Sequence, residues 1–159
     1  MIVGNTDSCV YFRRRWDDWK SKGFPEGDSL IVPLLEKLAG LPGVTPVWSC
    51  QGHLESDDPR DHRFYIALCA TAQGMRCLFQ IEQLFDAYPF EERPMLEQTR
   101  LIQDFTDTAN RPLDEWEEWH GWQFFKRFEE YRHSPDDQRR MINRLEYLVE
   151  VVGRMQKAT

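Results

Sequence analysis

The feature that most constrains the fold is an unbroken apolar run, Phe64 to Ala70. A half-solvated strand alternates apolar and polar residues, whereas a continuous apolar run is typical of a strand inside a sheet. A second buried strand is predicted at Val44 to Ser49, and the polar stretch between the two, Gln51 to Arg63, is predicted to be a loop. The chain is therefore expected to fold around a sheet in which the apolar run is a central strand.

Four further segments carry apolar residues at helical spacing and are predicted to be helices. The clearest is the last, where Ser134 is the expected N-cap, Pro135 occupies the first helical position and Asp137 gives a variant of the capping box. The other three are expected after Asp7 or Ser8, after Asp28, and from Gly74 to Tyr88.

Two more strands complete the expected sheet. Met95 to Phe105 alternates apolar and polar residues, which favours a strand. The segment from Trp119 is ambiguous, because aromatic residues recur every three positions and drift around a helix without forming one face; we prefer a strand at Trp119 to Phe125. Thr106 to Asp114 between them is expected to be a loop. The fold class is thus a single α+β domain over residues 1–159, with a four-stranded, at least partly antiparallel sheet and three to four helices mostly on one face.

Composition excludes several classes of protein. With 159 residues, 41% hydrophobic and 30% charged, the chain is globular rather than disordered. No apolar run approaches the ~18 residues of a membrane span, and Met1 to Asn5 lacks the basic and apolar regions of a secretory signal, so we expect a soluble, cytoplasmic protein. The net charge of −7 argues against bulk nucleic-acid binding. The four cysteines have no CxxC spacing, so we expect reduced thiols and no structural zinc knuckle.

The segment Ser49-Cys50-Gln51-Gly52-His53 is the strongest candidate for a site. It joins a strand end to a polar loop, where functional residues are common. Cys50 is the candidate nucleophile or ligand contact, and His53 the candidate base or hydrogen-bond donor. Glycine at position 52 allows a ligand to approach the backbone closely. The remaining candidate ligand-binding residues are Ser49, Gln51 and Glu55, the last of which would orient His53.

Less specific explanations exist for each of these residues. Cys50 also fits the role of a small core residue at a strand end. His53 would then only hydrogen-bond the backbone of the turn, and the acidic residues after it would form a solvated loop. The Cys-x-x-His spacing supplies two metal ligands, whereas zinc takes four groups; the others would have to come from His62, His120 or a carboxylate. We therefore assign no metal ligands and no cofactor from the sequence.

The same segment resembles two families. Small bacterial and phage proteins of no established activity have a Leu-rich helix, a turn, a strand ending in Ser-Cys-x-Gly-His, a variable loop, an apolar strand and a helix. The matching part of this chain runs from Asp28 to Phe85. A more distant likeness is to the wybutosine-synthesising tRNA methyltransferase family, which has Ser-Cys-Ser-Gly-Arg at a comparable strand end and binds S-adenosylmethionine. Only Ser49, Cys50 and Gly52 correspond, and the resemblance implies where a ligand would sit rather than a reaction.

The tetrapeptide Gly27-Asp28-Ser29-Leu30 spells the signature of the GDSL hydrolases. Those enzymes also need an Asp three residues before a His, and none of the four histidines has one. We interpret the tetrapeptide as a helix cap.

Two hypotheses of function follow. In the first, the chain binds a nucleotide- or nucleoside-like molecule at Ser49 to His53, with chemistry at Cys50 possible. In the second, it is a non-enzymatic phage- or plasmid-type inhibitor of a host system, and an acidic, tryptophan-rich surface at Trp116, Trp119 and Trp122 masks a basic host protein. The bland explanation for the tryptophans is that they fill the core face of the sheet.

Overall fold

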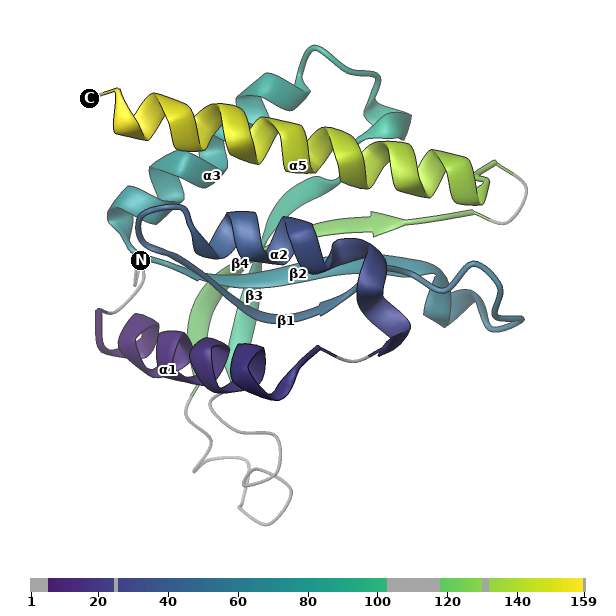
Figure 1. The fold of residues 1–159 in the computed structure, drawn as a ribbon. Helices are drawn as coiled ribbons and strands as arrows, with labels where there is room; N and C mark the ends of the chain where they lie inside the picture. Colours follow the sequence, from purple (N-terminus) through teal and green to yellow (C-terminus); the bar gives the residue numbers. More distant parts are fainter. Residues whose placement is uncertain (1–5, 25, 103–117, 130–131, 159) are drawn as a thin grey trace.

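Four strands form one antiparallel sheet in the order β1-β2-β4-β3 (Figure 1). The computed structural model describes residues 6–24, 26–102, 118–129 and 132–158. The strands are β1 (Val44–Cys50), β2 (Arg63–Ala70), β3 (Met95–Ile102) and β4 (Glu118–Arg127). The predicted central strand is β2, which pairs with β1 on one side and β4 on the other.

Helices cover both faces of this sheet, unequally. Three of them, α2 (Val32–Ala39), α3 (Ala72–Phe85) and α5 (Pro135–Lys157), lie on one face, and α1 (Thr6–Lys22) lies on the other (Figure 1). Three short 3₁₀ segments connect the elements: η1 (Glu26–Ile31), η2 (Pro59–His62) and η3 (Phe90–Glu92). This arrangement confirms the predicted α+β class with helices mostly on one face.

The core divides into two parts because β2 is apolar on both sides. Phe64, Ile66 and Leu68 point into the larger cluster with α2, α3 and α5. Ala67 and Cys69 point the other way, into a smaller cluster with Phe12 of α1. The continuous apolar run is therefore explained by burial on both faces.

Helix α1 is fixed to the edge of the sheet by one arginine. Arg13 Nη1 donates to the carbonyl of Ala39 at 3.0 Å, and Nη2 donates to the carbonyl of Val44 at 2.6 Å. The second bond satisfies an acceptor on β1, the edge strand. Arg13 thus adds polar contacts to the apolar packing of Phe12 and Trp16 that holds α1 in place.

The boundaries of several elements differ from the sequence expectations. Helix α1 begins at Thr6, so Asp7 and Ser8 lie within the helix and the expected cap at either position is wrong. Asp28 does not cap a helix: it lies inside η1 with a non-helical backbone, and the α-helix starts at Val32. The strand predicted from Met95 is confirmed over Met95–Ile102, and the rest of its predicted range, with the loop expected at 106–114, is outside the described residues. The preferred strand around Trp119 is confirmed as β4.

Hydropathy of the helices bears on the expectation about membranes. Within the part of the chain that the structure describes, none of the helices is both long and apolar enough to span a bilayer.

The capping box of α5 is formed as predicted. Ser134 Oγ accepts from the Asp137 amide at 3.2 Å, and the Asp137 carboxylate accepts from the Ser134 amide at 2.7 Å. These bonds satisfy two polar groups that would otherwise lack a helical partner. They also hold the pKa of Asp137 below its ordinary value.

Ser134→Ala is expected to lower the free energy of unfolding by about 1 kcal/mol, because it removes the N-cap acceptor. Ser134→Asp, which keeps an acceptor, serves as the control. Since the folded-state pKa of Asp137 is lowered, its contribution is present at neutral pH and is lost as the pH falls through that pKa. Urea unfolding at neutral and acidic pH measures both effects; equal stability of the two variants at neutral pH would contradict the cap.

Candidate functional site

The turn after β1 is built around Gly52. Its φ of +85° is a left-handed conformation that glycine adopts without strain. A Cβ at this position would lie 3.3 Å from the Phe128 ring and 3.4 Å from Gln138 Nε2. The backbone angle therefore favours glycine here, and a larger residue would also press on the Phe128 ring.

Gln138 of α5 stabilises this turn through its side-chain amide. Its Nε2 donates to the carbonyls of Gln51 and Gly52, at 2.6 Å each, and the side chain is only 6% exposed. A buried carbonyl without a hydrogen-bond donor lowers the stability of the fold, so these two bonds stabilise the turn. They also connect α5, at the end of the chain, to the site predicted near its middle.

The polar groups of Gln51 also have protein partners. Its amide donates to Asp28 Oδ1 at 3.1 Å, and its Oε1 accepts from the Leu30 amide at 3.0 Å. The turn is thus tied to η1 as well as to α5. In this structure Gln51 and Gly52 position the turn, and their predicted ligand-binding roles stay predictions.

Asp28 joins Cys50 and His53 in one cluster. One ligand atom from each of the three lies within 4.8 Å of the others, and all three side chains are partly buried. His53 Nε2 lies 3.5 Å from Asp28 Oδ1, while its Nδ1 lies 3.3 Å from Glu55 Oε1. The sequence predicted the proximity of Cys50, His53 and Glu55 but not Asp28, which was interpreted as part of a helix cap.

The surroundings of Cys50 favour its neutral thiol. Burial raises the pKa of the thiol, and the carboxylates of Asp28, Asp61 and Glu55 raise it further, against a lowering by a hydrogen bond from the Gly52 backbone. Tyr65, opposite Cys50 in the β1–β2 register, also has a raised pKa, mainly because of burial. A low-pKa thiolate nucleophile needs positive neighbours, and these neighbours are acidic.

The loop after the site is held by its own hydrogen bonds. The His53 amide donates to the Asp61 carbonyl at 2.7 Å, and Ser56 Oγ bonds Asp61 Oδ2 at 2.6 Å. His62 is 4% exposed, with Nε2 at 2.7 Å from the Ser56 carbonyl. Of the additional ligands considered from the sequence, His62 is therefore engaged in the loop, and the side chain of His120 is outside the described part of the structure.

A cleft of about 430 Å³ opens between α1 and β1, next to the cluster. Its lining residues include three tryptophans: Trp16 and Trp19 of α1, and Trp48 of β1. Trp19 and Trp48 are half-buried, whereas Trp16 is a core residue only 3% exposed. Ser49 and Asp28 line the same cleft, so it adjoins both the predicted site and the cluster. Its charged lining residues are Arg15, Asp18, Lys22 and Asp28.

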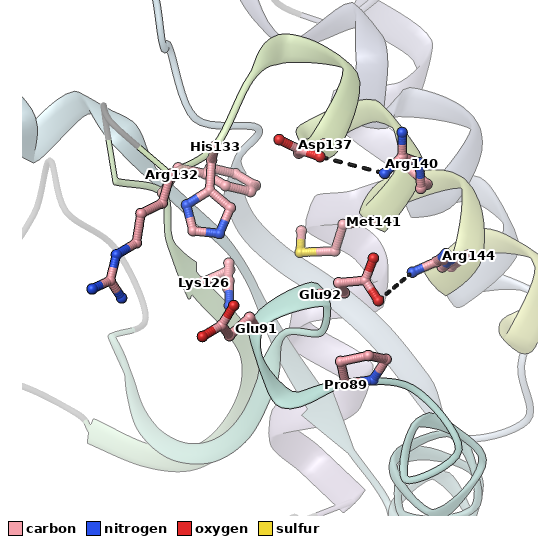
Figure 2. Close-up of a pocket in the computed structure, with 11 residues that line it drawn as sticks. Pro89, Glu91, Glu92, Lys126, Arg132, His133, Asp137, Arg140, Met141 and Arg144 are labelled. Carbon is pink, nitrogen blue, oxygen red and sulfur yellow. Dashed lines mark hydrogen bonds and ion pairs between the residues drawn. The ribbon is translucent and has the colours of Figure 1, made fainter.

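A second cleft, of about 370 Å³, lies under the start of α5 (Figure 2). Its basic and acidic residues face one another: Arg144 lies 3.5 Å from Glu92, and Arg140 lies 3.4 Å from Asp137. Burial lowers the pKa of Lys126 on its wall, while nearby carboxylates act in the opposite direction. This cleft shares no lining residue with the Asp28, Cys50 and His53 cluster, and basic side chains slightly outnumber acidic ones along it. Nη1 of Arg144 is buried there without a hydrogen-bond partner among the described residues.

The three tryptophans proposed as an interaction surface are described only in part. Trp116 is outside the described residues, and Trp119 lies in β4 opposite Leu101 without a described side chain. Trp122 is half-buried and meets Phe79 of α3 edge-to-face, with ring centroids 5.1 Å apart. The interaction role of these residues stays a prediction.

Comparisons with protein-family models, with curated proteins and with solved structures give no match. The interpretation of the site therefore rests on its own geometry.

Gln138→Met is expected to destabilise the protein by about 1–3 kcal/mol, because the thioether cannot donate to the two carbonyls of the turn. Gln83→Met, on the exposed side of α3, is the matched control and should stay within about 0.5 kcal/mol of the unsubstituted protein. Urea unfolding gives both values. Equal stability of the two variants would show that the turn does not depend on Gln138.

Cys50 is expected to react slowly with iodoacetamide at neutral pH, because a raised pKa leaves little thiolate. Its rate should rise with pH around a midpoint above that of an unfolded cysteine peptide. It should still exceed the rate of Cys69, which is fully buried. Peptide mapping by mass spectrometry measures each thiol; rapid modification of Cys50 at neutral pH would instead favour an activated nucleophile.

Proposed function

We propose that the protein binds a small, nucleotide- or nucleoside-like ligand in the cleft between α1 and β1. The observation that carries the proposal is the convergence of Trp16, Trp19 and Trp48 with Ser49 and Asp28 on one cleft. Ligand sites are typically concave and largely apolar, with a few polar groups that fix orientation. This cleft combines aromatic walls with a hydroxyl and a carboxylate.

The size and chemistry of the cleft suit such a ligand. Its volume of about 430 Å³ falls in the range of small-molecule sites, which is roughly 300–1,000 Å³. A nucleobase stacks on indole rings, and base–aromatic stacking is worth about 1–3 kcal/mol per base. Ser49 and Asp28 offer hydrogen bonds to a sugar or base edge. A phosphate would have to compete with Asp18 for Lys22, since these two side chains are paired at 2.8 Å.

Binding is better supported than nucleophilic catalysis. The Cys50 thiol has a raised pKa, mainly because of burial, which leaves little of the nucleophilic thiolate. An enzymatic role for Cys50 and His53, with Glu55 orienting the histidine, would require an activated thiol, whereas the charged groups that act on this thiol are carboxylates. The motif likeness to the wybutosine-synthesising methyltransferases agrees with a nucleoside-like ligand, because S-adenosylmethionine contains adenosine.

The second candidate is the interaction with a basic host protein. It is favoured by the net charge of −7 and by Phe79, which is 38% exposed beside Trp122. It differs from the first candidate in its surface, which would lie on β4 and α3 rather than at the cleft beside α1.

Trp48→Ala is expected to weaken ligand binding by about 5- to 150-fold, the equivalent of one lost base-stacking contact. The probes are adenosine, AMP, ATP, GMP and S-adenosylmethionine, titrated by calorimetry and by amide NMR shifts. Trp48→Phe should retain most of the affinity, and Trp122→Ala, which does not line the cleft, should leave it unchanged.

Two outcomes would count against the proposal. One is the absence of binding by every probe at millimolar concentration. The other is binding that Trp48→Ala leaves intact while Trp122→Ala removes it. Thermal melting of each variant separates lost binding from lost folding.

A further inference from the structure

We propose that Asp28, Cys50 and His53 form a binding site for a zinc ion. The three come from different parts of the chain: Asp28 from η1, Cys50 from the end of β1 and His53 from the turn that follows. The inference goes beyond the proposed ligand cleft and does not depend on it, although Asp28 borders both.

The spacing of the ligand atoms is close to what zinc needs. Zn–S bonds are about 2.3 Å and Zn–N or Zn–O bonds about 2.0–2.2 Å, so ligand atoms around a tetrahedral ion lie roughly 3.3–3.7 Å apart. The imidazole of His53 and the carboxylate of Asp28 are already 3.5 Å apart. All three ligand atoms lie within 4.8 Å of one another, so small side-chain rotations complete the set.

The ligand types select the metal. A thiolate, an imidazole and a carboxylate suit zinc, whereas calcium and magnesium take oxygen ligands. Three protein ligands also leave a fourth position for water or another molecule, as in zinc sites of the catalytic type. Because Asp28 lines the cleft, the ion would lie at its border.

Neighbouring groups are arranged as partners of metal ligands usually are. Metal-bound histidines commonly donate their second N–H to a carboxylate, and Glu55 Oε1 lies 3.3 Å from Nδ1 of His53. Asp28 Oδ1 accepts from the Gln51 amide at 3.1 Å, which fixes the carboxylate. Two of the three ligands are therefore oriented by a contact outside the set.

The electrostatics of the cluster also favour a cation. The carboxylates of Asp28 and Glu55 flank His53, and together with Asp61 they place negative charge around Cys50. A bound divalent ion neutralises this negative charge and holds the thiolate as a ligand. The competing explanation is that His53 interacts only with Asp28 and Glu55 and no metal binds.

The test is a cobalt titration of the full chain, after chelator treatment and in the presence of a non-thiol reductant. The expected result is one Co²⁺ per chain with a thiolate-to-cobalt charge-transfer band in the near ultraviolet. Added Zn²⁺ should remove the band by displacement, which also gives the zinc affinity. No organic ligand is present, so this result is separable from success or failure of the nucleotide titrations.

Variants assign the ligands. Cys50→Ser should abolish the charge-transfer band, and His53→Gln and Asp28→Asn should each weaken Zn²⁺ binding by more than Glu55→Gln does. Glu55→Gln removes only the hydrogen-bond partner of the ligand His53 and should lower the zinc affinity roughly 10- to 100-fold. Asp57→Asn, an exposed carboxylate of the same loop, and Cys77→Ala are the matched controls and should bind as the unsubstituted protein does.

Three results would overturn the site. The unsubstituted protein could give no charge-transfer band, which would mean that His53 interacts only with the two carboxylates; this result needs no variant to interpret. The band could persist in Cys50→Ser and vanish in Cys77→Ala. The zinc affinity could also be unchanged in both His53→Gln and Asp28→Asn, which would leave Cys50 as the single ligand of the three. Circular dichroism of each variant confirms that it is folded.

Discussion

The structure depends on the burial of β2 on both of its faces. Phe64, Ile66 and Leu68 require a layer of helices on one side, while Ala67 and Cys69 require cover on the other. Helices α2, α3 and α5 supply the first layer and α1 the second (Figure 1). Helix α1 covers β1 and β2, and Arg13 bonds it to the edge strand β1. A cleft forms where the last turns of α1 pass the end of β1.

The site is carried by a turn that the protein holds from two sides. Gln138 binds the carbonyls of Gln51 and Gly52, and Asp28 accepts from the Gln51 amide. A turn fixed in this way carries Cys50 and His53 as parts of the scaffold rather than of a free loop. Such support is what a binding site needs, because ligands must be held within a fraction of an ångström of their working geometry.

Sequence patterns located one part of the site and missed two others. The Cys-x-x-His spacing predicted that Cys50 and His53 would share a turn, because residues so close in sequence cannot separate far. Asp28 was missed, because its place beside Gly27 and Ser29 is also typical of a helix start. The tryptophan cleft was missed because a bulge between Pro46 and Trp48 changes the alternation of β1, so that Trp48 faces α1.

The sequence by itself determined the elements: the two-sided strand, the helices with their apolar faces, the cap at Ser134 and the tight turn at Gly52. These follow from local periodicity, backbone preferences and capping chemistry, which act within a few residues. Only the tertiary structure decided which distant groups meet. The amide of Gln138 at the turn, Asp28 beside Cys50 and His53, and the indoles of α1 across from Trp48 all depend on packing between separate elements. No short-range pattern encodes the distances between these groups, because they are set by how the helices pack on the sheet.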